Sequence, residues 1–235
     1  MSTLFHVRPM MRLLATGAGV AAGGYAAYAG MTWIRYGRTP PADPAERDEL
    51  LDAFMPTYDI VERHHIGVSA PVAVTLAAAK DQDLLQAPVV RAIFRTREIV
   101  LGSTRDTGGA PRGLMAVVQS LGWRVLAEVP DREIVVGAVT KPWETDVTFR
   151  GLPPEEFAAF HEPGFVKIAW TLRADPVGEA SSVFRTETRA IATDATARAK
   201  FRQYWSLVSP GVSTIRWLSL RPLKHEAERR VRSAA

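Results

Sequence analysis

The chain has 235 residues, of which 47% are hydrophobic and 23% are charged, and its formal net charge is +4. This apolar content argues against disorder and supports one globular domain with an appendage. The sequence has no cysteine, so disulfide bonds and thiolate metal sites are excluded. Much of the basic excess lies late in the chain without a recognisable nucleic-acid motif, so we expect a solvated helix face and no nucleic-acid partner.

The first predicted element is an uncharged stretch over residues 13–34, which is long enough to cross a bilayer as a helix. Arg8 and Arg12 precede it, and Trp33 lies at its far end, where interfacial residues settle. We therefore predict a transmembrane helix or signal anchor over 13–36, although many Ala and Gly residues make it weakly hydrophobic.

A retained helix predicts a single-pass membrane protein. The side on which the domain lies stays open, because arginines flank both ends of the segment. The alternative is a cleaved signal peptide, since Ala27-Tyr28-Ala29 resembles a cleavage site, and the domain would then be secreted or periplasmic. A buried soluble helix is the third interpretation.

Composition divides the rest of the chain. Prolines stiffen the stretch after the first helix, which predicts a linker leading to a folded domain that begins near Tyr58. The predicted divisions are a tail (1–12), the membrane segment (13–36), the linker (37–57), the domain (58–230) and a basic tail (231–235).

Within the domain, alternation of apolar and polar residues predicts strands, and a three-to-four-residue apolar spacing predicts helices. The predicted strands cover 58–67, 124–129, 133–139, 143–150, 166–173 and 182–192. The predicted helices cover 72–80, 87–96, 114–121, a short segment from 152 to 160, and a long amphipathic helix from 194 towards the end. A glycine-rich loop over 102–112 lacks the Gly-Lys-Ser/Thr ending of a phosphate-binding loop, so we expect no nucleotide site there.

Helix ends carry their own signals. Ser69 with Pro71 predicts the start of the helix at 72, and Asp194 is a natural cap for the terminal helix. Pro210 predicts a kink or break in that helix, or a second helix capped by Ser209, because proline lacks a backbone N–H. Pro222 raises the same expectation near the end.

Several short stretches add to this order of elements. They are Tyr58-Asp59-Ile60-Val61-Glu62-Arg63, Ser69-Ala70-Pro71, Gly122-Trp123, Gly137-Ala138-Val139, Thr186-Glu187-Thr188-Arg189 and Ala197-Arg198-Ala199-Lys200-Phe201-Arg202-Gln203-Tyr204-Trp205. Over about residues 58–230 the chain resembles the START and Bet v 1-like superfamily (SRPBCC, polyketide cyclase/dehydrase-related proteins), in particular its uncharacterised bacterial members. The resemblance implies an α+β helix-grip fold, in which an antiparallel sheet wraps around a long C-terminal helix and leaves a hydrophobic cavity between them.

Two groups of side chains are candidates for chemistry. His64 and His65 lie on a strand, so one can line a pocket while the other faces out, and no metal site is expected from them. Arg185, Glu187 and Arg189 share one face of another strand. They are either a polar anchor for a carboxylate or carbonyl ligand or a ladder of exposed ion pairs, and the packing potential of the opposite face favours the exposed arrangement.

Aromatic side chains near the predicted cavity are the remaining candidates for ligand contact. Trp170 lies on the apolar side of its strand and Trp205 on the apolar side of the terminal helix, with Tyr204 beside it. Trp143 lies at a strand end, where a pocket rim is expected. Each of these residues either lines a ligand cavity or fills the core, since both roles predict the same sequence.

We therefore expect a membrane-tethered binding or carrier domain for a hydrophobic small molecule or lipid, with no organic cofactor. One alternative is an enzyme of the cyclase, dehydratase or hydrolase type, with His64, His65 or Glu187 as general acid or base. The other is a membrane scaffold with a filled core. No Gly-x-Ser-x-Gly elbow is present in the sequence, so no nucleophile is assigned.

Overall fold

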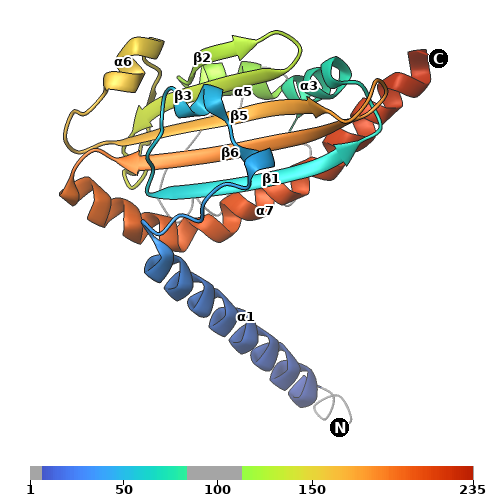
Figure 1. Cartoon of the computed structure of the whole chain (residues 1–235). Coiled ribbons are helices and arrows are strands. Elements are labelled where there is room, and N and C mark those ends of the chain that lie inside the picture. The colour runs from blue at the N-terminus through green and yellow to red at the C-terminus, as the bar shows by residue number, and fades with distance from the viewer. Residues whose placement is uncertain (1–6, 84–112, 235) are drawn as a thin grey trace.

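The computed structural model describes residues 7–83 and 113–234, and its centre is an antiparallel sheet with the strand order β1-β6-β5-β3-β2 (Figure 1). A short strand, β4, pairs with β3 beside this path. The strands are β1 (Ile60–Val68), β2 (Arg124–Val129), β3 (Glu133–Thr140), β4 (Phe149–Arg150), β5 (Val166–Pro176) and β6 (Ser182–Ala192). The predicted helix over 87–96 and the loop over 102–112 lie outside the described residues.

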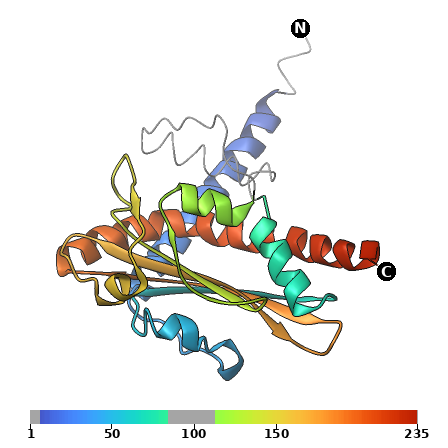
Figure 2. The same ribbon diagram turned by 90° about the horizontal axis from the view of Figure 1, so that it is seen from above.

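Helices cover the sheet on both sides (Figure 2). The helices are α1 (Val7–Arg35), the 3₁₀ helix η1 (Pro44–Glu46), α2 (Glu49–Asp52), α3 (Val72–Asp81), α5 (Leu114–Ser120), α6 (Pro154–Ala159) and α7 (Ala195–Ala234). Helices α3, α5 and α7 lie on one face of the sheet, here called the inner face, while η1 and α2 lie on the other, the outer face. An antiparallel sheet against one long C-terminal helix confirms the predicted α+β helix-grip architecture.

Strand alternation decides which side chain reaches which face. On β6, even-numbered residues such as Phe184 and Ala190 pack in the inner cores, and odd-numbered residues such as Glu187 point to the outer face. The inner core is apolar around Trp170 and Leu172 of β5. The outer core is built from Val135, Val139 and Ala169 of the sheet with Leu51, Met55 and Phe157 above them. Both faces of the sheet are therefore buried.

The segment expected as a linker, 37–57, packs on the outer face. Asp48 caps α2, because its side chain accepts a hydrogen bond from the Leu51 backbone N–H at 2.7 Å. Leu51 and Met55 are then buried against the sheet, with 0% and 2% of their surface exposed. We call residues 44–58 the strap. The prolines of this segment predicted a linker, but Leu51 and Met55 give the segment a buried apolar face.

Helix α7 differs from the prediction in its continuity. It runs unbroken for 40 residues through Pro210 and Pro222, so the expected break or second helix is wrong. Buried neighbours of the two prolines, Ser209 and Leu223, keep the helix packed on the domain at both positions. Its start is as predicted: the Asp194 carboxylate accepts from the backbone N–H groups of Thr196 and Ala197 at 2.7 and 2.9 Å.

Two smaller predictions are also corrected. The strand expected over 143–150 is reduced to the two residues of β4. The residues before it form turns, because Pro142 removes a backbone donor and the stretch has few apolar residues to bury. The helix α3 begins after Pro71 with no side-chain cap, so Ser69 is not its capping residue. The backbone N–H of Ser69 instead donates to the Glu228 carboxylate of α7 at 3.0 Å.

Helix α1 covers residues 13–35 of the range 13–36 that was predicted to cross a bilayer. Within the described part of the chain, however, we find no helix with both the length and the apolar character needed to span a membrane. Ala and Gly fill much of α1 and contribute little hydropathy. Its C-terminal end packs on α7, where the Arg202 guanidinium lies 4.3 Å from the centre of the Trp33 ring and donates to the Trp33 carbonyl. From there α1 projects away from the sheet (Figure 1).

Candidate functional site

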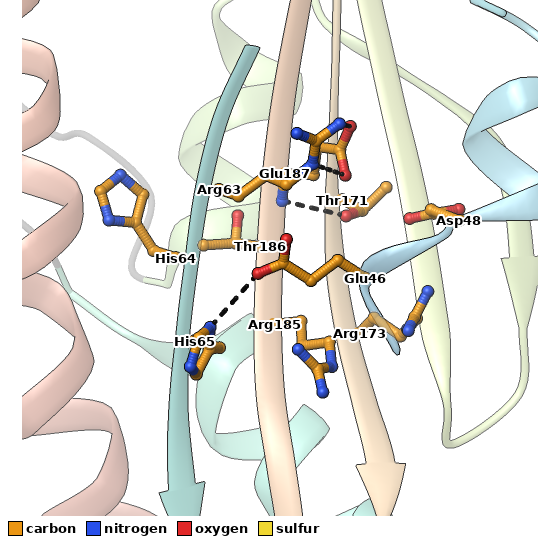
Figure 3. A pocket seen from close by; sticks show the side chains of 10 residues that line it. All are labelled: Glu46, Asp48, Arg63, His64, His65, Thr171, Arg173, Arg185, Thr186 and Glu187. Carbon is orange, nitrogen blue, oxygen red and sulfur yellow. Dashed lines mark hydrogen bonds and ion pairs between the residues drawn. The ribbon is translucent and has the colours of Figure 1, made fainter. Parts of the chain in front are cut away.

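A cluster of charged side chains lies on the outer face, between the sheet and the strap (Figure 3). Glu187 stands at its centre and accepts hydrogen bonds from two arginines. The Arg63 guanidinium reaches both of its oxygens, at 3.0 and 3.2 Å, and Arg189 Nε reaches one of them at 2.6 Å. Glu187 and Arg189 are only 5% and 2% exposed. Such bidentate pairing gives the buried charges two aligned hydrogen bonds in addition to their electrostatic attraction.

The same arginines hold the strap in place. Arg189 donates to the Met55 carbonyl at 2.8 Å and pairs with Asp52, and Arg63 donates to the Tyr58 hydroxyl at 2.9 Å. Further along the sheet, Arg173 donates to the Arg47 carbonyl at 2.7 Å. Each bond joins a strand to a residue between 44 and 58. The outer cluster is therefore a fastening for the strap.

Two buried ionisable groups accompany this fastening. Burial, and then the neighbouring charge of Asp48, raise the pKa of Glu133 to about 8, while Arg173 acts in the opposite direction. Glu133 under the strap therefore binds its proton more tightly than an ordinary glutamate does. Burial lowers the pKa of Lys167, whose ammonium donates to the Ala158 carbonyl at 2.9 Å.

The outer cluster leaves little room for a ligand. Its hollow has a volume of about 20 Å³, the space of roughly one water molecule. Arg185 and Glu187 were predicted either to anchor a ligand in the cavity or to face solvent, and the structure places them in neither position. Arg185 donates to Asp175 at 3.0 Å, and Glu187 lies beneath the strap. No pattern in the sequence indicates that the strap covers this face, so this arrangement was not predicted.

A second polar cluster lies on the inner face, where the strand register assembles it. His64 is directly opposite Thr186, and Glu62 is directly opposite Thr188. On the next strand, Trp170 is opposite Thr188. These five positions share one face because each is two residues from the next along its strand or faces it across the sheet. We call them, with Ser213 and Arg216 of α7, the inner polar cluster.

Helix α7 completes the cluster from above. The Ser213 hydroxyl hydrogen-bonds Glu62 at 2.9 Å. Arg216 donates to the hydroxyls of Thr186 and Thr188 at 3.2 and 2.9 Å. Its guanidinium carbon lies 5.2 Å from the centre of the Trp170 ring. Polar groups from three elements therefore converge between the sheet and α7.

Several of these inner groups are incompletely satisfied. His64 Nε2 lies 3.5 Å from Glu62 and is buried without a hydrogen bond, and the buried Ser209 hydroxyl also lacks a partner. Arg216 is half-buried by surface area, yet burial lowers the pKa of its guanidinium to about 10, against the opposing effect of Glu62. Most buried polar atoms in proteins are paired. A third unsatisfied atom, Glu133 Oε1, lies on the outer face beneath the strap. The two on the inner side, together with the half-buried Arg216, mark the inner polar cluster as the candidate site.

The other predicted residues fall into three places. Trp170 is in the inner cluster. Tyr204 and Trp205 stack around Phe201 near the start of α7, and Trp143 packs at the edge of the same group, so these three belong to packed core. His65 points to the outer face, where its side chain is 59% exposed and lies 3.6 Å from Glu46. Figure 3 shows the His64 side chain directed away from the outer face, toward α7.

Sequence reasoning missed Glu62 and Arg216. Arg216 was grouped with the solvated basic residues of the terminal helix. The signal for a different role was present: Val212, Leu220 and Leu223 are four, four and seven residues away, on the same helix face. All three pack inward. Its position inside an apolar stripe distinguishes Arg216 from the solvent-facing basic residues of α7.

Comparison with known proteins gives only distant likenesses. No family model and no curated protein matches the sequence. Among solved structures, the chain is similar to a conserved protein from Geobacillus kaustophilus (10% identity, 74% of this chain and 97% of that one, TM-score 0.33). It is similar to a norcoclaurine synthase from Thalictrum flavum (12% identity, 71% and 96%, TM-score 0.34). It is also similar to an aromatase/cyclase from Streptomyces (13% identity, 75% and 98%, TM-score 0.25). At such values neither fold nor function is inferred from these proteins.

Proposed function

We propose that the domain binds an apolar small molecule or lipid between the inner face of the sheet and α7. The observation that carries this proposal is the pair of buried polar atoms without partners, His64 Nε2 and Ser209 Oγ, on the side of the sheet where the inner polar cluster adjoins the apolar core. Apolar pockets with a few polar groups are the usual form of small-molecule sites. Burial of the ligand contributes about 25 cal/mol per Å² of apolar surface before the costs of association.

Ligand extraction tests this function. The full-length protein is purified, treated with organic solvent, and the extract is analysed by mass spectrometry, in parallel with titration by the neutral apolar dye N-phenyl-1-naphthylamine. We expect a stoichiometric compound in the extract or saturable dye binding. Ser209→Phe fills the proposed space, whereas Leu207→Phe, at a position that is 51% exposed on the same helix, leaves it open.

The two variants give the outcomes a clear meaning. Dye binding lost in Ser209→Phe and kept in Leu207→Phe supports an interior site, provided that circular dichroism shows both variants folded; Ser209→Val is the milder replacement if the first does not fold. No extracted compound and no dye binding would contradict the proposal and leave a scaffold with a filled core.

A catalytic role is the second candidate, because His64 and Glu62 lie 3.5 Å apart on the inner face. A histidine beside a carboxylate can transfer a proton as general acid or base, as a cyclase, dehydratase or hydrolase needs. Once extraction identifies a compound, its conversion is compared in wild type, His64→Gln and Glu62→Gln. The control is His65→Gln, since His65 lies on the outer face. Equal turnover in all four proteins would remove this candidate.

We also propose that α1 associates the domain with a membrane. Five large apolar side chains of this helix are more than 40% exposed: Tyr25, Tyr28, Met31, Trp33 and Ile34. Aromatic residues followed by Arg35 and Arg38 suit the level of lipid headgroups. The proposal is that α1 contacts a membrane. Whether the helix spans the bilayer or lies on its surface is decided by the carbonate wash described next.

Fractionation of cells tests the association. We expect the protein in the membrane fraction, and a carbonate wash then separates the two forms: retention indicates a spanning helix and release indicates surface contact. Trp33→Glu combined with Ile34→Glu is expected to shift the protein to the soluble fraction. Val177→Glu, at a 65% exposed position between β5 and β6, is the control. Wild-type protein found only in the soluble fraction would contradict the proposal.

A further inference from the structure

Arg216 is the charged group of the inner polar cluster that the fold leaves without a counter-charge. Its two hydrogen-bond acceptors, Thr186 and Thr188, are neutral hydroxyls, and the Trp170 ring beneath it is neutral as well. Among the described residues no carboxylate forms an ion pair with it. Arg63, Arg173 and Arg189 on the outer face each pair with a carboxylate. Arg216 therefore differs from these three arginines in having no ion-pair partner among the described residues.

The nearby carboxylate, Glu62, is already engaged. It accepts from Ser213 at 2.9 Å and lies 3.5 Å from His64 Nε2. Its charge acts on Arg216 from a distance, where it opposes but does not overcome the effect of burial. A charge held in a poorly solvated space without a close partner is unfavourable. Binding of an opposite charge therefore has more to gain here than at the protein surface.

The guanidinium also has unused donors. Arginine has five N–H groups in a fixed plane, and Arg216 uses one from each terminal nitrogen for the two threonines. The remaining donors match the two oxygens of a carboxylate or a similar planar or tetrahedral oxyanion. The guanidinium of Arg216 lies over the Trp170 ring, which is a cation–π contact. The threonines fix its orientation, so little freedom is lost when an anion binds.

We propose that Arg216 is the anchor for a single oxyanion at one end of the apolar ligand, so that the domain selects monoanionic amphiphiles such as carboxylates over neutral molecules of the same shape. This inference rests on the proposed function, because the apolar body needs the interior space. Leu220 and Leu223, buried further along α7, provide the apolar surface beside the anchor. Glu62 sets the limit at one charge, because a second negative group would be repelled by it.

Two dyes with one aromatic framework test the charge preference directly. The first, 1-anilinonaphthalene-8-sulfonate, has one sulfonate, and the second, N-phenyl-1-naphthylamine, lacks it. Fluorescence titration of the full chain is expected to give a dissociation constant at least about ten-fold lower for the sulfonate. Dodecanoate is expected to displace the bound dye at concentrations where dodecanol displaces much less.

Variants on α7 assign the preference to one residue. Arg216→Met keeps an unbranched chain and removes the charge, and it is expected to weaken sulfonate binding about ten-fold while neutral-dye binding changes less than about two-fold. Arg216→Lys keeps the charge without the fork and is expected to retain part of the preference. Arg221→Met is the matched control, since Arg221 is exposed on the same helix and lies 5.8 Å from the Trp217 ring. Circular dichroism and melting curves establish that each variant is folded.

The outcomes separate this inference from the function on which it rests. Equal affinity for the two dyes, or an unchanged ratio in Arg216→Met, would overturn the anchor while leaving an apolar binding site. An equal loss in Arg221→Met would overturn it too, because the sulfonate would then bind at the basic surface. Failure of both dyes to bind would overturn the proposed function itself.

Discussion

The two faces of the sheet both bury charge, but they balance it differently. On the outer face, Glu187 lies between Arg63 and Arg189, and every one of these groups has an opposite charge in contact. On the inner face, Arg216 rests on two threonine hydroxyls. The contrast shows that a polar cluster can be present for two reasons. The outer set is complete and holds the strap in place. The inner set is incomplete, as a site for the proposed ligand would be.

The largest expected effect comes from breaking the outer cluster. Glu187→Gln removes the negative charge between two buried arginines, and we expect it to lower the free energy of unfolding by about 4 kcal/mol. The measurement is urea unfolding followed by circular dichroism. Glu162→Gln is the control, because its pair with Arg150 is exposed and contributes less than about 1 kcal/mol. A change in Glu187→Gln no larger than in the control would show that the outer cluster does not stabilise the fold.

The strap itself is the next test. Leu51→Ala leaves a cavity under α2, where Leu51 is 0% exposed, and should cost about 3 kcal/mol. Limited trypsin digestion should cut more rapidly after Arg47, which lies in the strap. Leu207→Ala, at a position 51% exposed on α7, is expected to change neither quantity. Unchanged digestion in Leu51→Ala would mean that the strap is held by its ion pairs alone.

The proton that Glu133 binds under the strap gives the outer face a pH dependence. The folded protein keeps this proton up to a pKa of about 8, whereas an unfolded chain releases it near 4.5. Stability from this group is therefore present below about pH 4.5 and is lost as the pH rises towards 8.

Glu133→Gln removes the titration while keeping a donor for Asp48. We expect it to raise the free energy of unfolding at pH 8 by about 2 kcal/mol and to have little effect at pH 4. Glu156→Gln, at an exposed position of α6, should follow the wild-type pH profile. Thermal melts between pH 4 and 9 provide the comparison, and parallel profiles for wild type and Glu133→Gln would contradict the raised pKa of Glu133.

The smallest stability effect is expected on the inner face. Arg216→Met removes a charge that has no ion-pair partner among the described residues, so we expect the free energy of unfolding of the ligand-free protein to change by less than about 1 kcal/mol. The same urea titration used for Glu187→Gln gives a direct comparison. A loss as large as that of the outer variant would mean that Arg216 is a structural group like Arg63.

Periodicity and capping predicted most of the described fold. The alternation over 166–173 and 182–192 identified β5 and β6, and Asp194 identified the start of α7. These signals are local, so the sequence alone contains them. The burial of Leu51 was not predictable in the same way, because it depends on the sheet that the strap meets after folding.

The candidate site was harder to predict because alternation does not tell which face of a strand meets the long helix. Arg185, Glu187 and Arg189 were expected either to anchor a ligand or to form exposed ion pairs, with the exposed arrangement favoured. They lie on the face of the sheet that the strap covers instead. Thr186 and Thr188, between them, support the anchor. Only the pairing of β6 with β1 and the position of α7 decide between these two sets, and both depend on contacts between residues far apart in the chain.

The two prolines of α7 have a mechanical consequence. Pro210 and Pro222 lie inside the helix, and each lacks the N–H that would bond to the carbonyl four residues earlier. Arg216 lies midway between them, six residues from either. The helix therefore lacks a hydrogen bond in the turns 206–210 and 218–222, on either side of the proposed anchor. The short segment between these two turns, which carries Arg216, can shift as a unit when molecules of different width bind.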